Sequence, residues 1–146
     1  MSTDNSDNSG LARLQQLLEG GEGGPMLKTM QQRVVSAIDG EVVVEGTPAP
    51  QFNNYQGRIH GGYLAALVDT ALGAAVASKL PLNIGFGTVD LNVKFVRKFE
   101  VATGPVYATG RVVHAGRSMI TAECKVADTS GVLYAHGSGT FLVYPK

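Results

Sequence analysis

The stretch that decides the fold is residues 60–80, HGGYLAALVDTALGAAVASKL, because it is the only long segment of the chain with the composition of a helix. On a helical wheel, with about 100° per residue, apolar residues three and four positions apart gather on one side. In this segment they form a stripe of six residues: Leu64, Leu67, Val68, Ala71, Leu72 and Ala75. This pattern predicts a helix whose apolar stripe faces a sheet.

The other side of this helix carries small residues around one carboxylate, Asp69. Its other members are Gly62, Ala65, Ala66, Gly73, Val76 and Ala77. Asp69 is the only Asp, Glu, Lys or Arg between Ile59 and Ser78, whereas a helix that faces solvent normally carries several charges. We therefore expect both sides of the helix to be buried, one by the sheet and the other by a second subunit.

Strand patterns lie on both sides of the helix in the sequence. Before it, residues 32–38 and 41–47 are two β-prone runs around Asp39-Gly40, which predicts a hairpin. After it, four further strands are expected over 88–96, 105–115, 119–128 and 132–144. The short separators between these four runs favour an antiparallel meander.

One long helix cannot cover both faces of such a sheet, so we expect an α+β fold in which an antiparallel sheet of five to six strands wraps around one central helix. The length of 146 residues suits a single domain that needs no disulfide or metal to hold its core. We expect residues 1–24 to form a flexible N-terminal tail with a short helix over 11–19, and residues 25–146 to form the domain.

Composition argues against several classes of function. Twelve Lys and Arg balance 12 Asp and Glu, so the basic excess typical of nucleic-acid binding is missing. No apolar run reaches the roughly 18 residues of a membrane span, and the polar N-terminus lacks the apolar stretch of a secretory signal. The single cysteine, Cys124, fits a reducing cytosol. We therefore expect a cytoplasmic protein without nucleic-acid or membrane partners, and the spacing of its three histidines predicts no metal site.

Two features of the helical segment carry chemistry. A lone carboxylate is costly to bury unless it is paired or used, so Asp69 is a candidate general base or nucleophile. The alternative is that Asp69 caps a loop or pairs with Arg58 or Lys94. At the helix start, His60-Gly61-Gly62 would leave unpaired backbone N–H groups open to a ligand oxygen, as in an oxyanion site. The alternative there is that the glycines only allow close packing.

The spacing Asn54-x-x-Gly57-x-x-His60-Gly61-Gly62-(x)6-Asp69 resembles the active-site segment of hotdog-fold acyl-CoA thioesterases of the PaaI type. Three later segments are similar to the same family: GTVDLNVKF at 87–95, GRSM at 116–119 and GSGTF at 137–141. The resemblance covers residues 40–144. It implies a hotdog fold and hydrolysis of an acyl- or aryl-CoA thioester to the free acid and CoA, without a metal or redox cofactor.

The resemblance also implies roles for the matching residues. Asp69 would be the acidic catalytic residue, as general base or nucleophile, and the Gly61 N–H would polarise the thioester carbonyl. Asn54 would orient water or the carbonyl, His60 would brace the loop, and Thr88 would lie near the carboxylate. Our candidates for substrate contact, with the cationic ones meeting CoA phosphates, are Gly62, Arg97, Lys98, Gly116, Arg117 and Ser118.

Two other functions on the same fold stay open at this point. One is a non-catalytic module that binds acyl-CoA, which would not need Asp69. The other is a hydratase or dehydratase, in which His60 would act together with Asp69.

The length of the helix predicts that the site is shared between subunits. Gly61 and Asp69 are eight residues apart, which is about 12 Å along a helix axis, too far for both to reach one thioester. Two antiparallel copies of the helix about a two-fold axis would bring Gly61 of one chain to Asp69 of the other. We therefore expect a homodimer with shared active sites, and the resemblance implies that dimers pair into tetramers.

Overall fold

The computed structural model describes residues 9–21 and 23–145. Its helices and helical turns are, in chain order, α1 (Gly10–Leu18), α2 (Pro25–Thr29), η2 (Pro50–Phe52), α3 (Gly61–Ala77) and η3 (Val101–Thr103). Its strands are β1 (Gln32–Ile38), β2 (Glu41–Gly46), β3 (Ile84–Phe95), β4 (Val106–Ala115), β5 (Met119–Ala127) and β6 (Leu133–Pro145).

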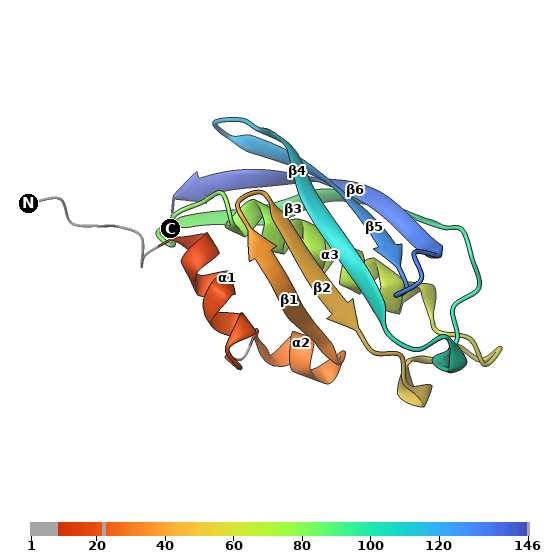
Figure 1. Ribbon diagram of the computed structural model, residues 1–146. Coiled ribbons are helices and arrows are strands. Elements are labelled where there is room, and N and C mark those ends of the chain that lie inside the picture. Colours follow the sequence, from red (N-terminus) through yellow and green to blue (C-terminus); the bar gives the residue numbers. More distant parts are fainter. Residues whose placement is uncertain (1–8, 22, 146) are drawn as a thin grey trace, which may run out of the picture.

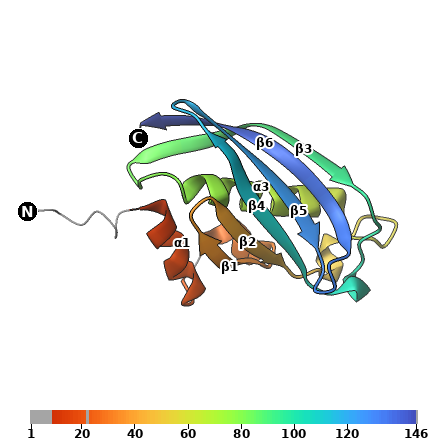
Figure 2. The same ribbon diagram turned by 45° about the horizontal axis from the view of Figure 1, so that its top comes forward.

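All six strands form one antiparallel sheet in the order β1-β2-β4-β5-β6-β3. The sheet curls around α3, which runs along its inner face (Figure 1 and Figure 2). This arrangement confirms the expected α+β fold with one long central helix.

The expected meander is correct for β4, β5 and β6 but wrong for β3. Strand β3 pairs with β6 at the edge of the sheet and does not neighbour β4. The segment between β3 and β4, which the sequence presented as a turn, is therefore a crossover. It is held in place by Phe99, whose buried ring lies 5.6 Å from the ring of Tyr134 and whose carbonyl accepts a hydrogen bond from Ile59 N–H.

The core lies between α3 and the inner face of the sheet. The predicted apolar stripe of the helix is fully buried there. The helix can come this close because strand glycines face it: a Cβ atom on Gly110 would overlap the Ala71 carbonyl, and one on Gly139 would lie 3.1 Å from the Leu72 side chain. Packing of this kind fixes the position of α3 against β4 and β6.

The predicted N-terminal helix is confirmed as α1, which packs against β1 next to the start of the sheet (Figure 1). Leu14 is buried, and Gly10 N–H donates to the Leu80 carbonyl at 2.8 Å. The short helix α2, with Pro25 in its first turn, was not predicted. Residues 1–8 and 22 of the predicted tail lie outside the described residues, and the domain boundary after residue 24 stays a prediction. Among the described residues no helix could span a membrane.

We expect Gly110→Ala to destabilise the fold by about 3 kcal/mol, because the added methyl group would press on the α3 backbone, which cannot turn aside as a side chain can. Urea unfolding measures this. Gly87→Ala is the matched control, since a Cβ atom there would come no closer than 3.7 Å to its neighbour, the Tyr144 hydroxyl. Equal midpoints for the two variants would contradict the proposed packing.

Candidate active site

The start of α3 is set by His60, which is the N-cap residue. His60 Nδ1 accepts a hydrogen bond from Gly62 N–H at 2.8 Å, and the His60 carbonyl accepts one from Tyr63 N–H at 2.9 Å. Among the hydrogen bonds of the described residues, none uses the Gly61 N–H. Gly61 is thus the residue whose N–H at this helix start is left for a ligand, where the helix dipole favours negative charge.

The same hydrogen bond determines which ring nitrogen of His60 carries the proton. Because Nδ1 accepts a hydrogen bond, the proton of the neutral ring must be on Nε2. A neutral His60 in this arrangement has no free lone pair with which to act as a base. Its exposed Nε2–H can only donate.

Asp69 lies on α3 beside β3. Thr88 Oγ1 donates a hydrogen bond to Asp69 Oδ1 at 2.9 Å, and this contact is exposed on the surface of the protomer. The hydrogen bond holds one carboxylate oxygen and leaves the other oxygen available. The structure therefore brings together two of the predicted site residues, Asp69 and Thr88.

A β-bulge in β3 makes this contact possible. The register with β6 shifts between Thr88, which pairs with the buried Phe141, and Asp90, which pairs with Thr140. Strict alternation would place Thr88 on the outer face together with Asp90. The extra residue, Val89, turns Thr88 to the inner face instead.

Helix α3 and strand β3 run side by side in opposite directions, and their contacts form successive layers. Gly61 faces the ring of Phe95, Asp69 faces Thr88, and Gly73 faces the ring of Phe86. We call the surface formed by these six residues the α3–β3 face. Phe86 was missed in the sequence because the predicted strand began at Thr88, whereas β3 begins at Ile84. In the sequence Phe95 is only one of the alternating apolar residues of the expected strand.

Asn54 shapes the loop before the helix. Its Oδ1 accepts hydrogen bonds from the backbone N–H groups of Gln56, at 2.8 Å, and Arg58, at 3.2 Å. Any orienting role toward a substrate would therefore fall on its side-chain NH2 group. That role stays a prediction.

Apart from Gly62, the residues predicted to contact the substrate fall into two groups that a single protomer does not bring together. Arg97 and Lys98 follow β3 at the α3 N-terminal end, where Lys98 pairs with Glu100. Hydrogen bonding to Lys98, with a smaller effect from Arg58, lowers the pKa of Glu100.

The second group, Gly116, Arg117 and Ser118, forms the β4–β5 turn at the opposite end of the sheet. Phe95, two residues before Arg97, pairs with Ala135 of β6, whereas the Ser118 carbonyl accepts from Val143 N–H. Ala135 and Val143 are eight steps apart along β6, which corresponds to about 26 Å.

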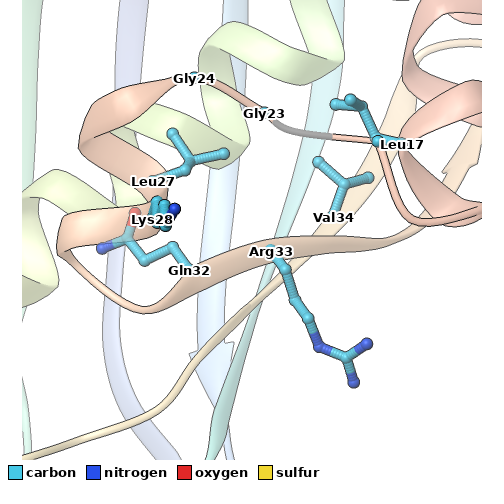
Figure 3. Close-up of a pocket in the computed structure, with 9 residues that line it drawn as sticks. Leu17, Gly23, Gly24, Leu27, Lys28, Gln32, Arg33 and Val34 are labelled. Atoms are coloured by element: carbon cyan, nitrogen blue, oxygen red, sulfur yellow. The ribbon is translucent and has the colours of Figure 1, made fainter.

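Two hollows lie away from Asp69. The first, of about 170 Å³, lies between α1, α2 and β1 at the sheet edge opposite β3 (Figure 3). Apolar Leu17, Leu27 and Val34 line it, and the Arg33 guanidinium points away to bind Glu45. The second, of about 380 Å³, is lined by residues of β4, β5 and β6, among them Arg111 and His136. Within residues 9–21 and 23–145, no three His, Cys, Asp or Glu side chains are grouped to hold a metal ion.

Cys124 lies in β5 with its side chain in the core, and burial raises the pKa of its thiol to about 12. The raised pKa means that the thiol stays protonated throughout the neutral range, so it is a poor nucleophile. We expect Cys124 to react very slowly with a thiol-specific disulfide reagent at pH 8 in the folded protein and quickly in urea. Rapid reaction of the native protein would contradict this burial.

Residues 56–135 match the sequence model of the thioesterase superfamily. A protein of Halobacterium salinarum named as a candidate esterase is 34% identical, over 82% of this chain and 84% of that protein.

Two solved structures share the fold. A conserved protein of Pseudomonas aeruginosa is 30% identical, with a TM-score of 0.77 over 82% of this chain and 94% of that one. The Escherichia coli PaaI protein from the phenylacetic acid degradation operon is 23% identical, with a TM-score of 0.79 over 92% and 95% of the two chains. This chain therefore belongs to the thioesterase superfamily and has its hotdog fold, which confirms the resemblance found in the sequence.

Proposed function

We propose that this chain is an acyl-CoA thioesterase that uses Asp69 as its catalytic carboxylate. The observation that carries the proposal is the hydrogen bond from Thr88 to Asp69 on the exposed α3–β3 face. An oriented carboxylate, met by the unpaired N–H at the start of a second copy of α3, is what hydrolysis of an activated ester needs.

In the proposed reaction, the second oxygen of Asp69 takes a proton from water as the water oxygen attacks the thioester carbon. The negative charge that develops on the carbonyl oxygen is stabilised by a Gly61 N–H. The C–S bond then breaks, and CoA leaves as a thiolate that takes up the proton held by Asp69. In the alternative route, Asp69 attacks the carbon itself and water hydrolyses the resulting anhydride.

The position of His60 favours hydrolysis over the hydratase alternative. A hydratase would need His60 as a base or acid, but its Nδ1 caps α3. The presence of Asp69 with its oxygen held by Thr88 likewise favours a catalyst over a module that only binds acyl-CoA. His60 then serves to hold the helix start, and with it Gly61.

Positive charge near the helix start suits the phosphates of CoA. Three exposed cationic residues lie at the N-terminal end of α3, where Gly61 begins the helix: Arg58, Arg97 and Lys98. Phosphate groups favour such clusters and helix N-termini. The protein needs no cofactor in this reaction beyond the CoA of its substrate. A reducing, cytoplasmic location fits the single buried cysteine.

We also propose that two copies of the chain share each active site. β3 lies at the edge of the sheet with exposed apolar side chains, including Val89, Leu91 and Phe95. An unprotected apolar edge of this kind favours association with another strand. A second copy of α3, antiparallel to the first, would supply Gly61 opposite Asp69 and cover the α3–β3 face. Pairing of such dimers into tetramers is part of the same proposal.

We expect Asp69→Asn and Asp69→Ala to fold and to lose thioesterase activity by about 10²-fold or more, as removal of a general base does. Release of CoA from a panel of acyl-CoA substrates, followed with a thiol reagent, measures the loss. Asp90→Asn is the matched control because it removes an exposed carboxylate from the outer face of β3, the strand that bears Thr88. Wild-type turnover in the Asp69 variants would exclude the proposed role.

Complementation tests the shared site. Gly61→Pro removes the N–H donor at a helix position that tolerates proline, and it should be as inactive as Asp69→Ala. In a mixed dimer one site contains both lesions and the other contains neither. After subunit exchange an equal mixture should recover about a quarter of wild-type activity. No recovery despite exchange proven by mass spectrometry would rule out the shared site.

A further inference from the structure

Side-chain hydrogen bonds tie helix α3 to both edge strands of the sheet, and they use two consecutive residues of the helix. Asp69 accepts from Thr88 of β3 at 2.9 Å, and Thr70 Oγ1 donates to Oε1 of Gln32, on β1, at 3.2 Å. Strands β1 and β3 stand at the two ends of the strand order. The curled sheet therefore holds the middle of the helix from both of its edges.

Gln32 is a polar side chain in a place where an apolar one would fit. It is only 6% exposed, and its stem borders the apolar hollow between α1, α2 and β1. Its amide points away from Leu17 and Val34 of that hollow (Figure 3). The Nε2 atom is buried and makes no hydrogen bond within the described part of the chain. A buried donor without a partner costs about 1–3 kcal/mol, so stability does not account for this glutamine.

The Tyr63 hydroxyl does not account for Gln32 either. Burial raises the pKa of Tyr63 to about 12, with a smaller opposing effect from the Gln32 amide, so the two groups are neighbours. The Tyr63 hydroxyl is already used, because it donates to the Thr47 carbonyl at 3.3 Å. Among the described residues, the side-chain hydrogen bond that Gln32 makes is the one to Thr70.

We propose that Gln32 is a positioning residue of the active site, which acts through Thr70 to hold Asp69 in its catalytic position. This inference rests on the proposed thioesterase function. Side-chain atoms at the rim of a helix lie about 5–6 Å from its axis, so a rotation of about 10° moves them by about 1 Å. A displacement of about 1 Å can lower a rate by about 10²-fold. A directional hydrogen bond at the residue next to Asp69 opposes such a rotation.

The glycine contacts beneath α3 do not replace this restraint. The close contact at Gly110 is with the backbone of Ala71 and Leu72, on the buried side of the helix. It determines which side of α3 faces the sheet and how close the two lie. The hydrogen bonds of Asp69 and Thr70 act at the two edges, where the same small rotation produces the largest movement of side-chain atoms.

The test compares Gln32→Met and Thr70→Val, each assayed for kcat and KM with benzoyl-CoA and hexanoyl-CoA. Methionine keeps the length of glutamine without its amide, and valine keeps the shape of threonine without its hydroxyl. Each variant should lower kcat by about tenfold and leave KM within about twofold of wild type. The double variant should lose no more than either single one, because both remove the same hydrogen bond. Thr70→Ser, which retains the hydroxyl, should keep the wild-type kcat.

Gln15→Met is the matched control. Gln15 Nε2 donates to the Ala37 carbonyl of β1, so this variant removes a glutamine hydrogen bond at the same sheet edge that does not involve α3. Its kcat should equal that of wild type. Gln32→Met should be at least as stable to urea as wild type, because it removes an unpaired buried donor. In the Asp69→Ala background, Gln32→Met should leave the residual rate unchanged, since no carboxylate remains to be positioned.

The outcomes separate this inference from the proposed function. An unchanged kcat in Gln32→Met, an equal loss in Gln15→Met, no retention of kcat in Thr70→Ser, or a further fall in the Asp69→Ala background would overturn the positioning role and leave the thioesterase in place. A loss of activity that follows a lowered urea midpoint would overturn it as well.

If the wild-type protein releases no CoA from any thioester, the proposed function fails. The NMR resonance of the Asp69 carboxyl carbon, assigned by its loss in Asp69→Asn, then decides the inference. A shifted resonance in Gln32→Met and Thr70→Val, but not in Gln15→Met, supports the positioning role, and any other pattern overturns it.

Discussion

The close contact between α3 and the sheet is the constraint on which the rest of the molecule depends. Gly110 lets β4 approach the helix backbone, Gly137 and Gly139 of β6 leave room for the Val68 and Leu72 side chains, and the side of α3 that faces these glycines is fully buried. Once that side is fixed, the rotation of the helix about its axis is fixed as well. Asp69 has no other direction to face than along β3, where Thr88 meets it.

Three polar side chains lie along the exposed side of α3 and at its start: Asp69, Thr88 and His60. Asp69 is the only charged residue of α3, so no cation on the same helix neutralises its carboxylate. Thr88 orients Asp69 without altering its charge, and His60 orients the helix start through its own ring nitrogen. Both contacts are hydrogen bonds and not ion pairs, so Asp69 is the one charged group of the described helix α3.

The sequence predicted the parts of the fold that local patterns determine. The apolar stripe of α3, the hairpin at Asp39-Gly40 and the later strands were all visible as periodicities. The edge position of β3 was not, because strand order depends on long-range pairing and the crossover contains turn-like residues. The contact between Thr88 and Asp69 was inferred only by resemblance. Alternation alone put Thr88 on the wrong face, since a single-residue bulge at Val89 has no periodic signal.

The pairing of β3 with β6 has a consequence for synthesis of the chain. Ile84 pairs with Pro145, so these two partners are 61 residues apart in the sequence. Strand β3 leaves the ribosome well before its partner, and its apolar side chains have no sheet neighbour until residues 133–145 have emerged. The strand that bears Thr88 is therefore among the last parts of the sheet to be secured, because its neighbour in the sheet is the last strand in chain order.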